Sequence, residues 1–111
     1  MAVSAAVLVE ATLVSDSTVT QYAVTGAAAI IDKFTATNIS ASTVSLSVYL
    51  VPSGSAAGAN NRIMVDTTIA AGATYTFPEL VGHTLVTGDA IATIASAPNA
   101  LVLRVSGRSV T

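Results

Sequence analysis

Hydrophobic residues recur along the chain with a period of two, which is the pattern of β-strands and not of helices. The clearest example is residues 42–51, where four aliphatic side chains alternate with two serines and a tyrosine. The aliphatic residues are Val44, Leu46, Val48 and Leu50. We predict a strand whose aliphatic face lies on the core. Residues 100–105 repeat the pattern, so Leu103 and Val105 are predicted to be buried.

β-Branched residues and turn residues predict further strands at 7–13, 19–24, 29–40, 62–69, 73–77 and 90–97. Three short turns, at 15–17, 71–72 and 98–99, are predicted to join neighbouring strands as hairpins. In residues 62–69 one face is predicted to carry Ile63, Val65, Thr67 and Ile69. The pattern therefore predicts an all-β fold, an antiparallel β-sandwich of seven or eight strands of the jelly-roll or immunoglobulin-like type.

The composition favours one domain with an unusual surface. The chain has 111 residues, which suits a single β-sandwich domain spanning 1–111. Apolar residues make up 52% and charged residues only 9%, whereas about a quarter is charged in an ordinary soluble domain. The 12 serines and 15 threonines can cover part of the exterior. We expect the rest to be buried against other chains.

Charge and hydropathy argue against two classes of partner. The net charge is −2, and the four basic residues, Lys33, Arg62, Arg104 and Arg108, are scattered along the chain. Nucleic acids and anionic membranes attract clustered basic residues, so we predict neither partner. Apolar runs such as 27–31 are much shorter than the roughly 20 residues of a membrane helix.

Candidate chemistry is sparse. Glu79 and His83 form the one close pair of a carboxylate and an imidazole, but the segment lacks the sharp turn that presents a catalytic serine. We interpret His83 as a residue that orders the crossing between strands. Four aspartates, Asp16, Asp32, Asp66 and Asp89, are isolated from one another in the sequence. We therefore predict no enzyme activity, no catalytic or metal-binding residue and no cofactor.

Two segments are predicted to contact neighbouring chains. Residues 1–6 are a candidate extended arm, and they lack the positive charge that begins a secretory signal, so we expect them in the mature protein. Residues 52–61 form a predicted protruding, mobile loop of small residues. The candidate interface residues are Ala2, Val3, Ser53, Gly54, Ser55, Asn60 and Asn61. Leu8, Val14 and Val102 fall on predicted outer faces and would also need partners.

Several motifs in order resemble a known class of protein. They are Phe34–Ser40, Val48–Gly54 with the loop that follows, Ile69–Tyr75, Pro78–His83, Gly88–Asp89 and Leu101–Gly107. Each is a common turn or strand of a sandwich. Their order and spacing resemble the small β-sandwich structural proteins of tailed bacteriophages, a family without catalytic residues.

The resemblance implies a part of a virion that is assembled in the cytoplasm of a host bacterium. Its implied role is a capsid cement or decoration protein that stabilises contacts between major capsid subunits. Its partners would be other virion proteins, the major capsid protein first, and copies of itself, with a trimer favoured among homo-oligomers. One alternative is a component of the neck, tail or fibre attachment. Another is a bacterial surface or polysaccharide-binding module.

Overall fold

Residues 2–111, described by a computed structural model, form an all-β molecule with two short 3₁₀-helices. The nine strands are β1 Val3–Leu13, β2 Val19–Ala23, β3 Ala28–Asn38, β4 Val44–Val51, β5 Arg62–Ile69, β6 Thr74–Tyr75, β7 Thr84–Val86, β8 Ala90–Ala95 and β9 Leu101–Val110. The helices are η1 Ala59–Asn61 and η2 Pro78–Leu80. The predicted count of seven or eight strands was too low, because β7, with three residues, is too short to show alternation in the sequence, whereas β6 lies within the predicted strand 73–77.

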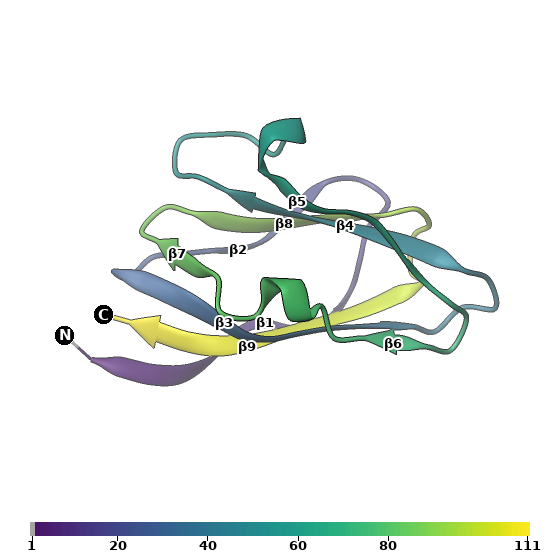
Figure 1. Ribbon diagram of the computed structural model, residues 1–111, viewed down its shortest axis with the longest axis horizontal. Coiled ribbons are helices and arrows are strands. Elements are labelled where there is room, and N and C mark those ends of the chain that lie inside the picture. Colours follow the sequence, from purple (N-terminus) through teal and green to yellow (C-terminus); the bar gives the residue numbers. More distant parts are fainter. Residues whose placement is uncertain (1) are drawn as a thin grey trace.

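The strands form two antiparallel sheets that face each other as two layers (Figure 1). The first, sheet A, has the order β1-β9-β3-β6, and β7 also pairs with β3. The second, sheet B, has the order β2-β8-β4-β5. Aliphatic side chains from both inner faces fill the space between the layers, so the architecture is a β-sandwich, as predicted.

The pairing of strands is nested. The first strand pairs with the last, β2 with β8, β3 with β6 and β7, and β4 with β5. Among residues 2–111, β4 and β5 are therefore the consecutive strands that pair with each other. The hairpins predicted at 15–17, 71–72 and 98–99 were wrong: at each, the chain passes from one sheet to the other. A short turn can connect two strands of the same sheet or two strands of different sheets. The alternation within a strand does not indicate which sheet the next strand joins.

The predicted inward phase of the two clearest strands was confirmed. Leu46, Val48, Leu103 and Val105 are all fully buried. The second face of β4 is more buried than predicted, because Ser47 lies beneath a polar cluster from β5. Its hydroxyl accepts from Arg62 Nη2 at 2.6 Å and from the Asp66 amide at 2.9 Å.

Bulges explain where the predicted alternation failed. Asp66 has φ +45°, and the register of β5 against β4 shifts beside it. A bulge adds one residue and moves the following side chains to the other face. Ile63 and Val65 therefore face solvent, whereas Ile69 faces the core.

Strand β1 contains two such shifts, between Val7 and Val9 and between Val9 and Thr12. Leu8 and Val14, which were expected on exposed faces, are buried in the core. Val102 is only half-buried. Strand β3 shifts its register against β9 between Ile31 and Lys33, and the side chains of Asp32 and Lys33 are exposed there.

Candidate interaction surface

The outer face of sheet A combines exposed apolar side chains with most of the positive charge of the molecule. It is formed by β1, β9 and β3, which lie side by side. On β1 the side chains of Val3, Val7 and Leu13 are exposed by 60%, 44% and 46%. Register places Val3 opposite Val110 and Leu13 opposite Val102, which extends the apolar surface onto β9. We call this surface the A face.

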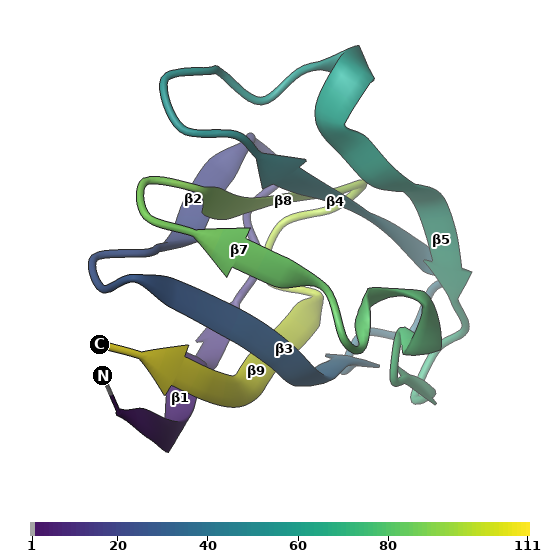
Figure 2. The ribbon, with the colours of Figure 1, turned by 60° about the vertical axis from the view of Figure 1, so that its left-hand side comes forward.

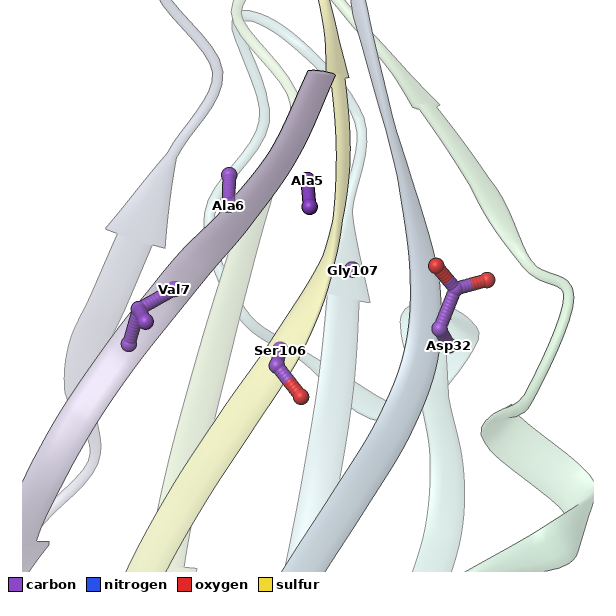
Figure 3. Close-up of a pocket in the computed structure, with 6 residues that line it drawn as sticks. All are labelled: Ala5, Ala6, Val7, Asp32, Ser106 and Gly107. Atoms are coloured by element: carbon purple, nitrogen blue, oxygen red, sulfur yellow. The ribbon is translucent and has the colours of Figure 1, made fainter. Parts of the chain in front are cut away.

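A hollow of about 390 Å³ lies in the A face (Figure 3). Its lining residues are Ala5, Ala6, Val7, Asp32, Ser106 and Gly107. Figure 3 shows Val7 on one side and the Asp32 carboxylate on the other, with Ser106 and Gly107 on β9 between them. The hollow exists because these side chains are short and because β3 bulges beside Asp32.

Gly107 is required at the floor of this hollow. Its α-carbon lies so close to β3 that a Cβ at this position would clash with the Ile30 carbonyl oxygen. A larger residue would push β9 away from β3, so the glycine sets both the strand packing and the depth of the hollow.

Charges on the A face are partly paired. Arg108 and Asp32 form a two-pronged ion pair, with Arg108 Nη2 2.9 Å and Nε 3.0 Å from the Asp32 carboxylate oxygens. Hydrogen bonding to Asp32 raises the pKa of the Arg108 guanidinium, and the charge of Asp32 acts in the same direction. Arg104 lies 3.9 Å from Glu10, a weak contact between exposed groups.

Lys33 and Arg104, together with Thr35 and Ser106, line a second hollow beside the first. The A face thus carries three of the four basic side chains and two of the six acidic ones, a net charge of +1. The remaining one basic and four acidic residues give −3, which together make the net charge of −2. An acidic or uncharged partner surface would be favoured on the A face.

The two segments predicted as interfaces lie in different layers. Ala2 and Val3 are exposed, and residues 3–6 are part of β1, where they pair with residues 107–110 of β9. The amide of Thr111 also donates to the Ala2 carbonyl oxygen at 3.0 Å. Met1 lies outside the described residues. Figures 1 and 2 show the loop between β4 and β5 on the side of the molecule opposite the N-terminus.

The loop is anchored at both of its ends. The amides of Ser53 and Val86 donate to the two carboxylate oxygens of Asp89, each at 3.0 Å. The Asn61 side chain, only 5% exposed, donates to the Ala56 carbonyl oxygen and accepts from the Gly58 amide. Asn61 therefore holds the loop in shape. The other loop residues predicted as interfaces, Ser53, Gly54, Ser55 and Asn60, are exposed.

Glu79 and His83 lie at the end of the molecule near η2 and β6. The Tyr75 hydroxyl donates to both Glu79 carboxylate oxygens at 2.9 Å. This hydrogen bond raises the pKa of the Tyr75 phenol, and desolvation and the charge of Glu79 add to the effect. The main chain of His83 accepts from the Ile31 amide at 3.0 Å, while its side chain is exposed. These contacts join the crossing segment to β3.

We expect His83→Ala to leave the melting temperature and any particle binding essentially unchanged. The backbone contact with Ile31 does not depend on the side chain, and substitutions at such surface sites usually alter stability by no more than about 0.5 kcal/mol. Thermal melting and a binding assay on the same preparation check this. A folded variant that has lost function would show that the imidazole has a role.

The structure was also searched for clustered ligands of metal ions. Within residues 2–111, no three histidine, aspartate or glutamate side chains gather in an arrangement that could hold a metal ion. Asp32, Asp66 and Asp89 each bind groups of the protein instead.

The A face could not be recognised from the sequence. Its residues come from three strands that are distant in the chain, and the pairing of β1 with β9 brings them together. The alternation of Val3, Ala5 and Val7 was the available signal.

Comparison with known proteins places the chain in no family: no protein-family model, curated protein or solved structure matches it. Among residues 2–111, no helix has the length and apolar character needed to cross a membrane.

Proposed function

We propose that the chain is a structural protein of a tailed-bacteriophage virion and, within that class, a capsid cement or decoration protein. The observation that carries the proposal is the line of exposed valine and leucine side chains on β1, beside a hollow in the A face. Exposed apolar groups gathered on one face favour a protein partner. That the assembly is a virion is proposed from the predicted resemblance of the ordered motifs to virion proteins.

The nested strand pairing supports the jelly-roll type over the immunoglobulin-like type. If β6 and β7 are counted as one interrupted strand, eight strands pair as first with eighth, second with seventh, third with sixth and fourth with fifth. A long antiparallel ribbon rolled up in this way gives a jelly roll, a fold used in viral capsid proteins. A fold alone does not define a function, so this agreement adds to the surface argument and does not replace it.

The proposed mechanism is the addition of contact area across neighbouring major capsid subunits. The A face would cover the seam, with the β1 valines on apolar groups and the basic residues facing acidic ones. A protein that binds the assembled shell and not the separated subunits stabilises the shell by mass action. The loop from Ser53 to Asn60 lies in the other layer and would be directed away from the shell or toward another neighbour.

Two alternatives differ in the partner. A neck, tail or fibre-adaptor component would use the same surfaces at lower copy number. A polysaccharide-binding module is less well supported, because such modules commonly stack sugars on exposed aromatic rings. Here Tyr49 is buried, and Tyr22 and Tyr75 are half-buried.

The test is to add the purified protein to virions of a phage whose copy of this gene has been deleted. We expect saturable binding with hundreds of copies per particle and a higher temperature of DNA release. Leu13→Glu on the A face should weaken binding at least tenfold, because it buries a charge in an apolar contact. Val65→Glu, at an apolar site on β5 that is 59% exposed against 46% for Leu13, is the matched control.

The outcome separates the candidates. Binding of a dozen copies or fewer would indicate the neck or tail. Absence of binding to any part of the particle would contradict the virion proposal. Equal loss of binding by the Leu13 and Val65 variants would contradict the assignment of the contact to the A face.

A further inference from the structure

Strand β1 presents a long edge of sheet A. Within residues 2–111 it pairs along one side with β9, and it is one end of the strand order. From Val3 to Val7 its register against β9 is continuous, and this segment, Val-Ser-Ala-Ala-Val, contains neither a charge nor a proline. Proteins usually protect such edges with charges, prolines or bulges, because an exposed regular edge can pair with another strand.

The two edge strands of sheet B, β5 and β2, are less regular than the first half of β1. Strand β5 carries two register shifts against β4, and Arg62 and Asp66 form an ion pair of 3.1 Å on it. Strand β2 has five residues and a register shift between Thr20 and Tyr22. The regular first half of β1 is therefore the edge best prepared for pairing with another chain.

The orientation of the backbone groups on this edge follows from one hydrogen bond. The amide of Thr111 donates to the Ala2 carbonyl oxygen, so the polar groups of Ala2 point toward β9. Backbone groups of successive residues in an antiparallel strand point to alternate sides. The amide and carbonyl groups of Val3, Ala5 and Val7 therefore point away from β9, toward the open edge.

We propose that two copies of the chain associate through this edge, with the two β1 strands antiparallel about a two-fold axis at Ala5. Ala5 then pairs with Ala5 of the second copy, and Val3 pairs with Val7. All three residues offer their backbone groups to the partner, so the pairing forms about six hydrogen bonds. Sheet A becomes continuous across the two molecules.

Several features favour a second copy as the occupant. A two-fold pairing places each valine opposite a valine on the A face, which is a favourable cross-strand pair. Glu10, the first charged residue of the chain, falls beyond the paired segment, so equal charges are not brought together. The two A faces also join into one apolar surface.

In the proposed function the dimer would double the area of the A face that covers a capsid seam. This role of the dimer rests on the proposed function. The pairing itself needs only the chain. A pair of five-residue segments buries less than the roughly 1,600 Å² of a standard stable interface, so we expect reversible association that dissociates on dilution.

Cross-linking tests the register directly, because the natural chain contains no cysteine. We expect Ala5→Cys to be joined by a short bis-maleimide in nearly all molecules at concentrations where light scattering shows dimer. Leu13→Cys, on the same strand and also exposed, is the matched control. In the proposed register its two copies lie on the order of 50 Å apart and should not be joined.

Substitution tests the hydrogen bonds. Ala5→Pro removes an amide that points to the open edge and keeps the pairing with β9, so the variant should fold and its dimer dissociation constant should rise at least about tenfold. Val7→Lys should have a similar effect without a backbone change, because it places a charge against Val3 of the second copy in place of an apolar cross-strand pair, whereas Val65→Lys should have none. Melting curves confirm that each variant is folded.

Each other result overturns the edge proposal. These results are a monomer at all concentrations, a trimer, cross-linking of Leu13→Cys as efficient as that of Ala5→Cys, or a dimer that Ala5→Pro and Val7→Lys do not weaken. A monomeric protein that still binds virions would overturn the dimer alone. A dimer that binds no part of the virion would leave the edge pairing intact and contradict the proposed function.

Discussion

Replacing Phe34 by alanine is expected to lower the free energy of unfolding by about 3 to 5 kcal/mol. The ring is fully buried in the middle of β3, the strand that joins β9 to β6 and β7. It meets the Phe77 ring edge to face, with 5.0 Å between centroids, and Phe77 meets Tyr75 in the same way at 4.7 Å. Removing the first ring leaves a cavity and breaks this aromatic chain.

Urea denaturation followed by circular dichroism measures the loss, and the variant should remain folded enough for a two-state fit. Thr35→Ala is the matched control, because Thr35 is the next residue on β3 and its side chain lies on the A face. It should change stability by less than about 1 kcal/mol. A Phe34→Ala loss as small as that of the control would show that the ring is not packed as described.

Alternation in the sequence was sufficient to predict the class of fold and most of the strands. It depends on one property, the burial of every second side chain, which β9 follows closely, whereas in the middle of β4 both faces are buried. The partners of each strand depend on contacts between residues far apart in the chain. Val3 pairs with Val110, and nothing in the residues near Val3 indicates this. The wrong hairpins at 15–17, 71–72 and 98–99 share that cause.

Bulges set the second limit. Ile63 and Val65 were predicted on the same face as Ile69, but they face solvent and Ile69 faces the core. The difference depends on Asp66, whose φ of +45° is held by its contacts with Ser47 and Arg62. The backbone N–H of Asp66 donates to the hydroxyl of Ser47 on β4. The bulge at Asp66 therefore depends on the pairing of β5 with β4. The sequence of β5 alone gives no sign of it.

The motifs behind the predicted resemblance to virion proteins include turns that the structure holds by paired polar groups. Asp89 ties the β7–β8 turn to Ser53 at the start of the long loop. Gly88 beside it has φ +88°, and a Cβ there would clash with Ser53. The order and spacing of these motifs therefore reflect how this sandwich closes its turns. The surface that we propose for partners, the A face, involves β1, which lies outside those motifs.

The candidate interface residues divide in the same way. Val3 was selected from its position near the start of the chain, and it lies on both the A face and the open edge of β1. Asn61 was selected from the composition of the loop, yet its side chain is buried and bonded within the loop. Composition shows that a loop is rich in small polar residues, but it does not show which of them the loop uses to hold its own shape.

Asn38→Asp is expected to destabilise the protein by roughly 3 to 5 kcal/mol near neutral pH, the range for an uncompensated buried charge. Asn38 ends β3 and is fully buried. Its amide nitrogen donates to the carbonyl oxygens of Ser42 and Ile69 at 2.7 and 2.8 Å, and its oxygen accepts from the Ser40 amide at 2.9 Å. Aspartate keeps the shape of the side chain and the oxygen that accepts from Ser40. It replaces the NH₂ group, which donates both hydrogen bonds, by a negatively charged oxygen that faces the two carbonyl oxygens.

The pH dependence distinguishes this mechanism from simple loss of packing. Burial and the facing carbonyl oxygens disfavour the charged form, so the pKa of the introduced carboxyl is raised in the folded state. Below its ordinary pKa the neutral acid can donate to one of the two carbonyl oxygens. Stability is then lost as pH rises through the raised folded value, so the gap between variant and native protein should widen with pH.

Unfolding in urea at about pH 4.5 and about pH 8, with native protein measured at both, tests this sign. Asn60→Asp, a surface asparagine in the long loop, is the matched control and should show a small loss at either pH. An Asn38→Asp loss that is equal at the two pH values would mean that the introduced group is solvated when charged. In that case the link from β3 to the Ile69 carbonyl would be open to water, and the turn after β3 would be less tightly held than its hydrogen bonds indicate.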